Sequence, residues 1–146
     1  MSYGLLLTLH LLAAVAFAGT VFFEVVLLGG IHGRVLPENL RPVEQALATR
    51  ATQVMPWVLL VLFSAGLSLA WQHRAVLAHP LASSTGLLMT LKIALALSVF
   101  AHFATAMVWR RRGVLNGRRS HRLHLSVFCH VLLIIVLAKA MFFVRW

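Results

Sequence analysis

Four long runs of apolar residues follow one another along the chain, separated by three more polar connections. The runs cover approximately residues 3–31, 54–73, 86–109 and 123–144. A helix needs about 20 predominantly apolar residues to cross the hydrocarbon core of a bilayer, and each run is close to or above that length. The pattern therefore predicts four membrane-spanning helices.

The connections are short enough to join neighbouring spans. The first, HGRVLPENLRPVEQALATRATQ, contains Pro37 and Pro42 and then a patterned stretch. We expect this stretch to begin the second helix early, along the membrane surface. The other two connections are QHRAVLAHPLASSTG and RRRGVLNGRRSH, and we see no internal repeat. The 146 residues are thus predicted to form a single all-α domain, an integral membrane four-helix bundle.

The composition agrees with a membrane protein. Hydrophobic residues make up 61% of the chain and charged residues only 11%, and the mean hydropathy is +0.92. These values exclude an ordinary soluble domain and a disordered chain. The net charge of +10 would suggest nucleic acid as the partner of a soluble protein. Here most arginines lie in two inter-helix connections, so we expect a lipid bilayer as partner and no nucleic acid.

The arginines near the helix ends also predict an orientation. Those in the first and third connections are Arg34, Arg41, Arg50, Arg110, Arg111, Arg112, Arg118, Arg119 and Arg122, whereas the opposite side has only Arg74 and Arg145. Because basic residues are retained on the cytoplasmic side, both termini are expected outside the cytoplasm.

Several polar residues lie near the outer ends of the predicted spans. His10, Lys92 and Lys139 lie roughly 6–12 Å below the outer surface at a rise of 1.5 Å per residue, and His73 lies at the outer edge of the second span. Polar groups at such depths are costly and usually face a bundle interior, a cavity or a cofactor. They are the first candidates for a functional site.

A second polar group lies nearer the inner side. Glu24, His102 and His130 each lie roughly 10 Å in from the inner ends of their spans. His102 and His130 have matching depth on the third and fourth spans, as a bis-His pair holding haem b would have. The alternative is that each histidine simply hydrogen-bonds a neighbouring helix.

For the outer residues, too, a cofactor-binding role and a structural role are both open. His10 is a candidate ligand of a second haem, or of the only one, with His73 or a weaker ligand opposite. Lys92 either extends its ammonium towards the membrane surface or neutralises a porphyrin propionate or substrate carboxylate. Since Cys129 is the only cysteine, no C-x-x-C-H haem attachment exists and any haem is held without covalent links.

Copper is the competing ligand. In that interpretation His10 and His73 receive the ion on the outer side, and His102 and His130 release it on the inner side. The five methionines are scattered and none forms the closely spaced sulfur set that Cu(I) prefers. The sequence therefore gives copper little direct support.

Four segments, one in each span, carry a resemblance to a known superfamily. They are LHLLAAVAFAGTVFF, RATQVMPWVLLVLFSAGLSLAW, LKIALALSVFAHF and VFCHVLLIIVLAK. They resemble the four-span bacterial protoporphyrinogen IX oxidase of the HemJ type and its relative, the CopD copper-resistance domain. The resemblance places His10 on the functional histidine of that family, and Lys92 and His102 on the lysine and histidine of its third helix. Where the family has Asn-Glu, this chain has Cys129 and His130.

The resemblance implies a bacterial inner-membrane protein that binds haem b and oxidises protoporphyrinogen, with electrons passing to quinone and with His10 and Lys92 as catalytic residues. The loss of the Glu carboxylate argues against the oxidase activity, whereas the gained histidine favours a haem ligand. The leading interpretation is thus a haem b-binding membrane oxidoreductase or electron-transfer protein. The alternatives are a CopD-like copper transport protein and a non-catalytic subunit of a larger membrane complex or homo-oligomer.

Overall fold

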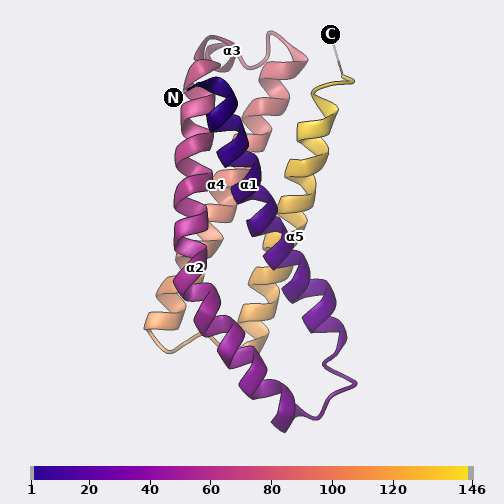
Figure 1. Ribbon diagram of the computed structural model, residues 1–146. Coiled ribbons are helices and arrows are strands. Elements are labelled where there is room, and N and C mark those ends of the chain that lie inside the picture. The colour runs from indigo at the N-terminus through magenta and orange to yellow at the C-terminus, as the bar shows by residue number, and fades with distance from the viewer. Residues whose placement is uncertain (1, 145–146) are drawn as a thin grey trace. The chain divides into compact units, whose positions relative to one another are not determined.

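The protein is built from helices throughout its described length. The computed structural model describes residues 2–144, so Arg145 lies outside the described residues. The helices are α1 (Tyr3–Phe22), η1 (Phe23–Leu28), α2 (Pro37–Gln72), α3 (Arg74–Ala78), α4 (Ser84–Arg111) and α5 (Gly117–Ala140), as Figure 1 shows. No strand occurs between residues 2 and 144. The all-α prediction is confirmed.

Four helical segments are long and apolar enough to cross a membrane. They are Tyr3–Leu28, Pro37–Gln72, Ser84–Arg111 and Gly117–Ala140. Many of their large apolar side chains, such as Leu12, Leu67 and Val136, are exposed. Exposed apolar faces on helices of this length are suited to contact with lipid tails. The prediction of a multi-pass membrane protein with four spans is therefore confirmed.

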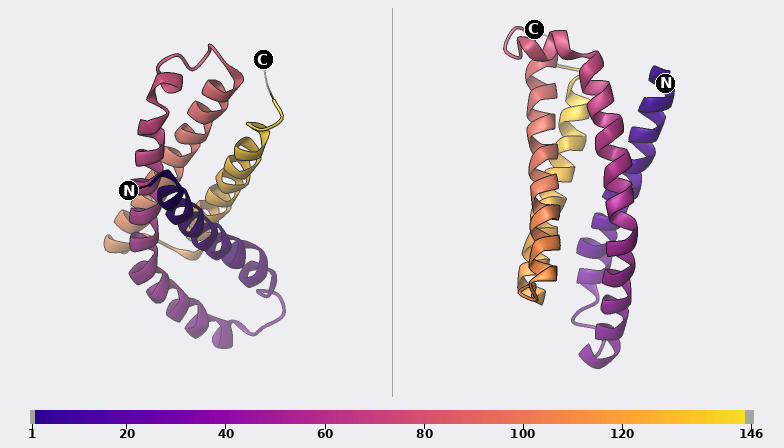
Figure 2. Two further views of the ribbon diagram at one scale, coloured as in Figure 1. Left: turned by 45° about the horizontal axis from the view of Figure 1, so that its top comes forward. Right: turned by 90° about the vertical axis from the view of Figure 1, so that its left-hand side faces the viewer.

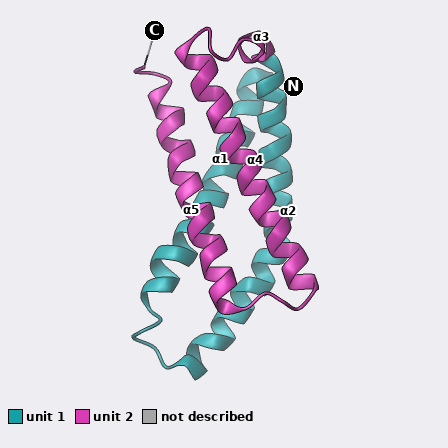
Figure 3. Ribbon diagram, turned by 180° about the vertical axis from the view of Figure 1, so that it is seen from behind, with its two compact units in different colours: residues 1–72 teal, residues 73–146 magenta. Residues whose placement is uncertain are grey.

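The chain divides into two compact units, each a hairpin of two long helices (Figures 2 and 3). The first unit is Met1–Gln72 and the second is His73–Trp146. In the first unit α1 packs on α2, and in the second α4 packs on α5. The prediction that the four helices form one bundle stays a prediction.

The first hairpin is held together by one face of α1. Its buried residues are Leu6, Ala13, Phe17 and Val21, which recur at spacings of seven, four and four, so they form a single stripe along the helix. On α2 the buried residues are Leu40, Leu59 and Ala65. His10 falls between Leu6 and Ala13 in the same stripe, and the packing of this face therefore directs its imidazole towards α2.

Helix α2 is longer than a single span requires. It runs for 36 residues and has Pro42 and Pro56 in its interior. Pro37 occupies its first position, where the missing N–H costs no hydrogen bond and the fixed φ suits a helix. The predicted early start is thus confirmed, and the apolar run from residue 54 is only the second half of the helix.

Helix α1 ends in a change of helical type. Residues Phe23–Leu28 form a π-helix, in which the N–H of Gly29 donates to the carbonyl of Glu24. After it, His32 Nε2 lies 2.7 Å from Glu44 Oε1 on α2. This contact between an imidazole and a carboxylate ties the turn between the two helices of the hairpin to α2.

The second hairpin has defined ends. The Ser83 side chain accepts a hydrogen bond from the Gly86 N–H at the start of α4, and Asn116 accepts one from the Arg119 N–H at the start of α5. Because the cap lies at Asn116, α5 begins six residues before the predicted span. At the open end of the hairpin, where α4 begins, the buried Ser84 hydroxyl donates to the carbonyl of Val144 at 2.9 Å. This bond holds the end of the described chain against α4.

Candidate functional site

His10 is held by the backbone of α2. Its Nδ1 lies 3.0 Å from the carbonyl oxygen of Leu62, and the residue is partly buried. A carbonyl oxygen can only accept, so Nδ1 carries the proton and donates it. In the neutral imidazole Nε2 is then left with its lone pair, which is the form that binds a metal.

Gly66 makes room for this imidazole. A Cβ at Gly66 would lie 3.0 Å from His10 Cε1 and 3.2 Å from Nδ1. Contacts this short force the neighbouring group to move. Gly66 lies one helical turn after Leu62, so the ring rests on the backbone of α2 at the level of its hydrogen bond.

The structure brings His102 and His130 together, as their matching depth predicted. Their ring centroids are 5.2 Å apart and the ring planes are inclined by 54°. His102 lies on α4 and His130 on α5. Each ring crosses the gap between the two helices and reaches a serine on the other helix.

Four hydrogen bonds connect these histidines in a closed ring. His102 Nδ1 lies 2.7 Å from the Ser98 carbonyl, and His130 Nδ1 lies 2.7 Å from the Ser126 carbonyl. Across the hairpin, His102 Nε2 lies 3.0 Å from Ser126 Oγ, and His130 Nε2 lies 3.1 Å from Ser98 Oγ. Since both Nδ1 atoms donate to carbonyls, each neutral ring accepts at Nε2 from a serine hydroxyl. We call these four residues the Ser–His ring.

Sequence reasoning missed the two serines, although the chain contains a signal for them. Residues 98–102 read SVFAH and residues 126–130 read SVFCH, so nearly the same pentapeptide occurs twice, with Ala101 in one copy and Cys129 in the other. In each copy the histidine donates to the carbonyl four residues earlier, and in the antiparallel hairpin each histidine meets the serine of the other copy. The expectation of no internal repeat overlooked this short one.

The fit of haem iron differs between the histidines. At His10 the Nδ1–H is held by a carbonyl, which is the usual second contact of a metal-binding histidine and fixes the tautomer that exposes Nε2. At His102 and His130 the same contact exists, but both Nε2 lone pairs already accept from serine hydroxyls. Iron could bind there only after the serines turned away. His10 therefore fits a haem ligand better than the inner pair does.

The other predicted site residues lie apart from the Ser–His ring. Lys92 is partly buried on α4. His73 precedes α3 as its N-cap residue and belongs to the second unit, whereas His10 belongs to the first. The pairing of His10 with His73 stays a prediction. Lys139 lies in the last turn of α5 with its Nζ 5.4 Å from the ring centroid of Phe143, a cation–π contact.

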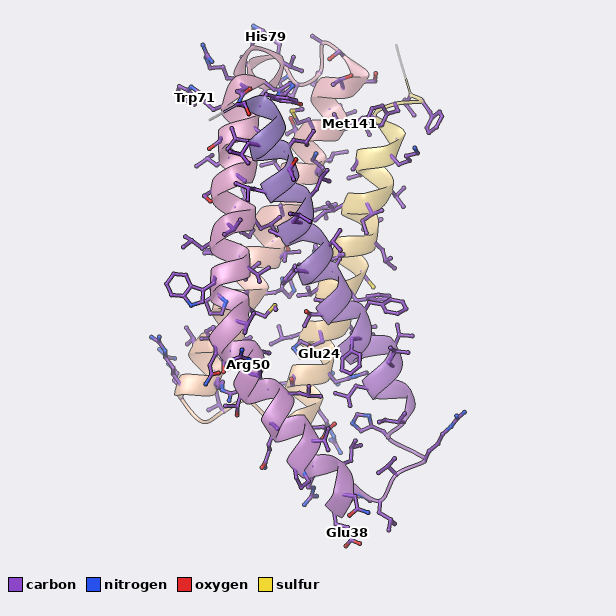
Figure 4. All side chains as sticks on the ribbon, viewed as in Figure 1. Glu24, Glu38, Arg50, Trp71, His79 and Met141 are labelled. Atoms are coloured by element: carbon purple, nitrogen blue, oxygen red, sulfur yellow. The ribbon has the colours of Figure 1, made fainter. Side chains whose placement is uncertain are left out.

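A groove runs along the first hairpin. It has a volume of about 480 Å³ and lies between residues 15–24 of α1 and η1 and residues 47–55 of α2. Its walls are mainly apolar, with Glu24 and Arg50 (Figure 4) among its polar residues. Arg50 donates to Gln53 Oε1 at 3.3 Å. Volumes of roughly 300–1,000 Å³ with a few polar groups are typical of small-molecule sites.

Within residues 2–144, no three His, Cys, Asp or Glu side chains come together in the way that a metal site built entirely from them requires. Comparisons with protein-family models, with curated proteins and with solved structures find no match to this chain. The resemblance to the HemJ type and to CopD therefore stays a prediction.

Proposed function

We propose that this chain is a haem b-binding integral membrane protein of the electron-transfer or oxidoreductase class, with His10 as an axial ligand. The observation that carries the proposal is the hydrogen bond from His10 Nδ1 to the Leu62 carbonyl. Metal-binding histidines almost always donate their second N–H in this way, because the contact orients the ring and makes Nε2 more basic. The groove along the same hairpin has mainly apolar walls, which do not include His10, and it suits a flat hydrophobic ligand such as a quinone.

Haem, when bound, supplies one-electron redox chemistry. The contribution of the chain is ligation, burial and charge compensation. His10 supplies the nitrogen ligand, and the apolar faces of the spans exclude water. Lys92 is the predicted cation for the third role, the neutralisation of a propionate or of a carboxylate of protoporphyrinogen. It belongs to the second unit, so its place beside the haem stays a prediction. In an oxidase, quinone would accept the electrons.

The experiment that tests the proposal is an oxidised and dithionite-reduced absorption spectrum of the detergent-purified protein, with metal analysis of the same sample. We expect a Soret band and an α band at near-stoichiometric iron. His10→Ala is expected to abolish or shift both bands. His79→Ala is the matched control, because His79 is exposed at the end of α3 and is not a proposed haem ligand. A colourless, iron-free protein after expression with ample haem would contradict the proposal, and copper in that sample would support the transport alternative.

Gly66 offers a finer test of the ligand assignment. Gly66→Ala places a methyl group 3.0 Å from His10 Cε1, so the ring must shift by a few tenths of an ångström. We expect a shifted spectrum and a loss of about 1–3 kcal/mol in stability, the usual cost of an extra methylene in a packed site. Gly4→Ala on the helix of His10 is the control, since nothing lies within 4 Å of a Cβ there and Gly4 lies outside the groove. If His10→Ala and Gly66→Ala leave the bands of a haem-loaded protein unchanged, His10 is not a ligand.

A further inference from the structure

Helix α4 stops and α5 begins at one end of the second hairpin, as Figure 3 shows. A second cavity lies near this end; its volume is about 280 Å³, and its walls are His102 and Trp109 from α4 and Arg119, Arg122, Leu123 and Ser126 from α5. Two guanidinium groups, an imidazole and a hydroxyl thus border one small space. Neither the haem proposal nor the copper alternative uses Arg119, Arg122 or Trp109.

One of the two arginines is held in place before any ligand binds. Arg119 Nη1 donates to the Val114 carbonyl at 2.8 Å, and the guanidinium carbon lies 5.5 Å from the ring centroid of Trp109. The Arg119 backbone N–H also donates to the Asn116 side chain at 2.9 Å. A guanidinium fixed by a carbonyl and an aromatic ring loses little freedom when it binds an anion, because its remaining N–H donors already have a set direction.

The surroundings favour an anionic ligand. This end of the hairpin carries Arg110, Arg111, Arg112, Arg118, Arg119 and Arg122. Within residues 110–122 there is no acidic residue to neutralise them. Phosphate oxygens accept two parallel N–H bonds from an arginine, so Arg119 and Arg122 supply the donors. The Ser126 hydroxyl and the His102 N–H already donate within the Ser–His ring. At about 280 Å³ the cavity has room for a phosphate group but is too small for a porphyrin.

We propose that the cavity lined by His102, Trp109, Arg119 and Arg122 is a binding site for the phosphate group of an anionic phospholipid. The cavity lies between two membrane-spanning helices at their most basic end, and basic pockets in that position take the headgroups of anionic lipids. Trp109 is the aromatic residue expected at the level of the headgroups. The same oxyanion chemistry would also bind free phosphate, so the test separates the two sources.

The site adjoins the Ser–His ring, which supplies a local reporter. His102 and Ser126 belong both to the cavity wall and to that ring. A phosphate held by Arg119 and Arg122 lies beside the His102 imidazole and alters its surroundings. The imidazole resonances of His102 therefore respond to a ligand in the cavity, whereas those of exposed His79 do not.

The experiment uses the full chain, delipidated in a neutral detergent. Binding of phosphatidylglycerol is measured by native mass spectrometry, and the histidine resonances are followed by NMR during the same titration. Arg119→Gln and Arg122→Gln are each expected to weaken binding about tenfold, the factor expected for one lost charge-assisted hydrogen bond. The matched control is Arg112→Gln, which removes the same charge from the same end of the hairpin but from outside the cavity wall. We expect it to weaken binding less than about twofold.

Inorganic phosphate, added to lipid-free protein, distinguishes the sources. A His102 shift with phosphatidylglycerol but not with phosphate assigns the site to lipid. A shift with both, lost in Arg119→Gln and Arg122→Gln, supports an oxyanion site open to both sources. Arg122→Lys keeps the charge, and its binding should lie between those of the wild type and Arg122→Gln if that variant is folded. Equal weakening by Arg112→Gln, or no His102 shift with either probe, would overturn the proposal.

Discussion

At the scale of single residues, the Ser–His ring shows how two nearly identical pentapeptides produce reciprocal hydrogen bonds. In each pentapeptide the histidine follows the serine by four residues. Because the two helices are antiparallel, the histidine of each pentapeptide lies at the level of the serine of the other. The histidine of SVFAH therefore reaches the serine of SVFCH, and the reverse. All four imidazole nitrogens have a hydrogen-bond partner within the hairpin. Satisfied polar groups of this kind fix the register of two helices in a membrane, where apolar contacts alone specify it weakly.

The value of one cross-helix bond is measurable by a double-mutant cycle. Ser98→Ala removes the hydroxyl that donates to His130, so we expect a loss of about 0.6–1.7 kcal/mol in the free energy of unfolding. In a His130→Ala background the same substitution should cost almost nothing, because the acceptor is absent. The measurement is unfolding of the detergent-solubilised protein by sodium dodecyl sulfate.

The control for this cycle is Thr105→Val on the same helix, since the Thr105 hydroxyl donates only to the Ala101 carbonyl of its own helix. We expect Thr105→Val to cost the same with and without His130. If Ser98→Ala is equally costly in both backgrounds, the bond across the hairpin contributes nothing to stability.

The sequence predicted where the histidines lie but not what holds them. Depth follows from residue count along a helix, so His102 and His130 could be placed at one level. The serines were overlooked because hydroxyls in apolar helices usually donate to the carbonyl four residues earlier, as those of Thr8, Thr20 and Thr90 do. The tautomer of His10 depends on the Leu62 carbonyl of another helix, and only the packed register supplies it.

At the scale of elements, α2 exceeds the membrane thickness. Its 36 residues span about 54 Å at 1.5 Å per residue, whereas the hydrocarbon core is about 30 Å thick. The first half of α2, residues 37–53, contains most of its charged and polar side chains. We therefore expect this half to lie outside the hydrocarbon while remaining helical.

Cysteine labelling in proteoliposomes tests that expectation. In a Cys129→Ala background, Gln45→Cys should react with a membrane-impermeant maleimide once the vesicles are made permeable. Leu60→Cys should remain unlabelled until detergent dissolves the bilayer, although Leu60 and Gln45 are both exposed in the protein. Labelling at residue 60 at the rate of residue 45 would show that α2 does not cross the bilayer where the apolar run predicts.

The bounds of the elements were predictable to different degrees. Apolar runs mark where a helix crosses lipid, because unsatisfied backbone groups cannot remain there, but they do not mark where the helix ends. Hence α2 and α5 begin before their apolar runs, at Pro37 and Gly117. The π-helix around Glu24 left no mark in the pattern, since its wider hydrogen bonds do not require a particular residue type.

At the scale of the whole molecule, composition and pattern determine the class of protein. A chain with four apolar runs has to form helices in a bilayer, and this is why the four spans could be predicted without any relative. The packing inside each hairpin could not be predicted from the sequence, because it depends on which small and polar residues meet across the two helices. Gly66 under His10 and Ser126 beside His102 are contacts of that kind.

The orientation of the whole chain is the remaining prediction, and the structure sharpens its basis. The end of α4, the turn after it and the first turns of α5 together carry six arginines, whereas the segment between α2 and α4 carries Arg74 alone. Basic residues within short connections stay in the cytoplasm during insertion. The α4–α5 turn should therefore be cytoplasmic and the end of α5 should lie outside. In the bacterial inner membrane, alkaline phosphatase fused after residue 146 should be active, and a fluorescent protein fused there should be dark.

A fluorescent protein inserted after Arg112 reports on the opposite side and should be bright, which controls for expression and folding of the fusion. Replacing Arg110, Arg111 and Arg112 by glutamine removes half of the arginines at this end while the apolar spans stay intact. Because the arginine excess rather than the apolar pattern sets the orientation, we expect this variant to become mixed, with both reporters partly active. A bright fluorescent protein at the C-terminus of the wild type would show that the chain has the opposite orientation. The arginine-lined cavity would then lie in the outer leaflet instead of the inner one.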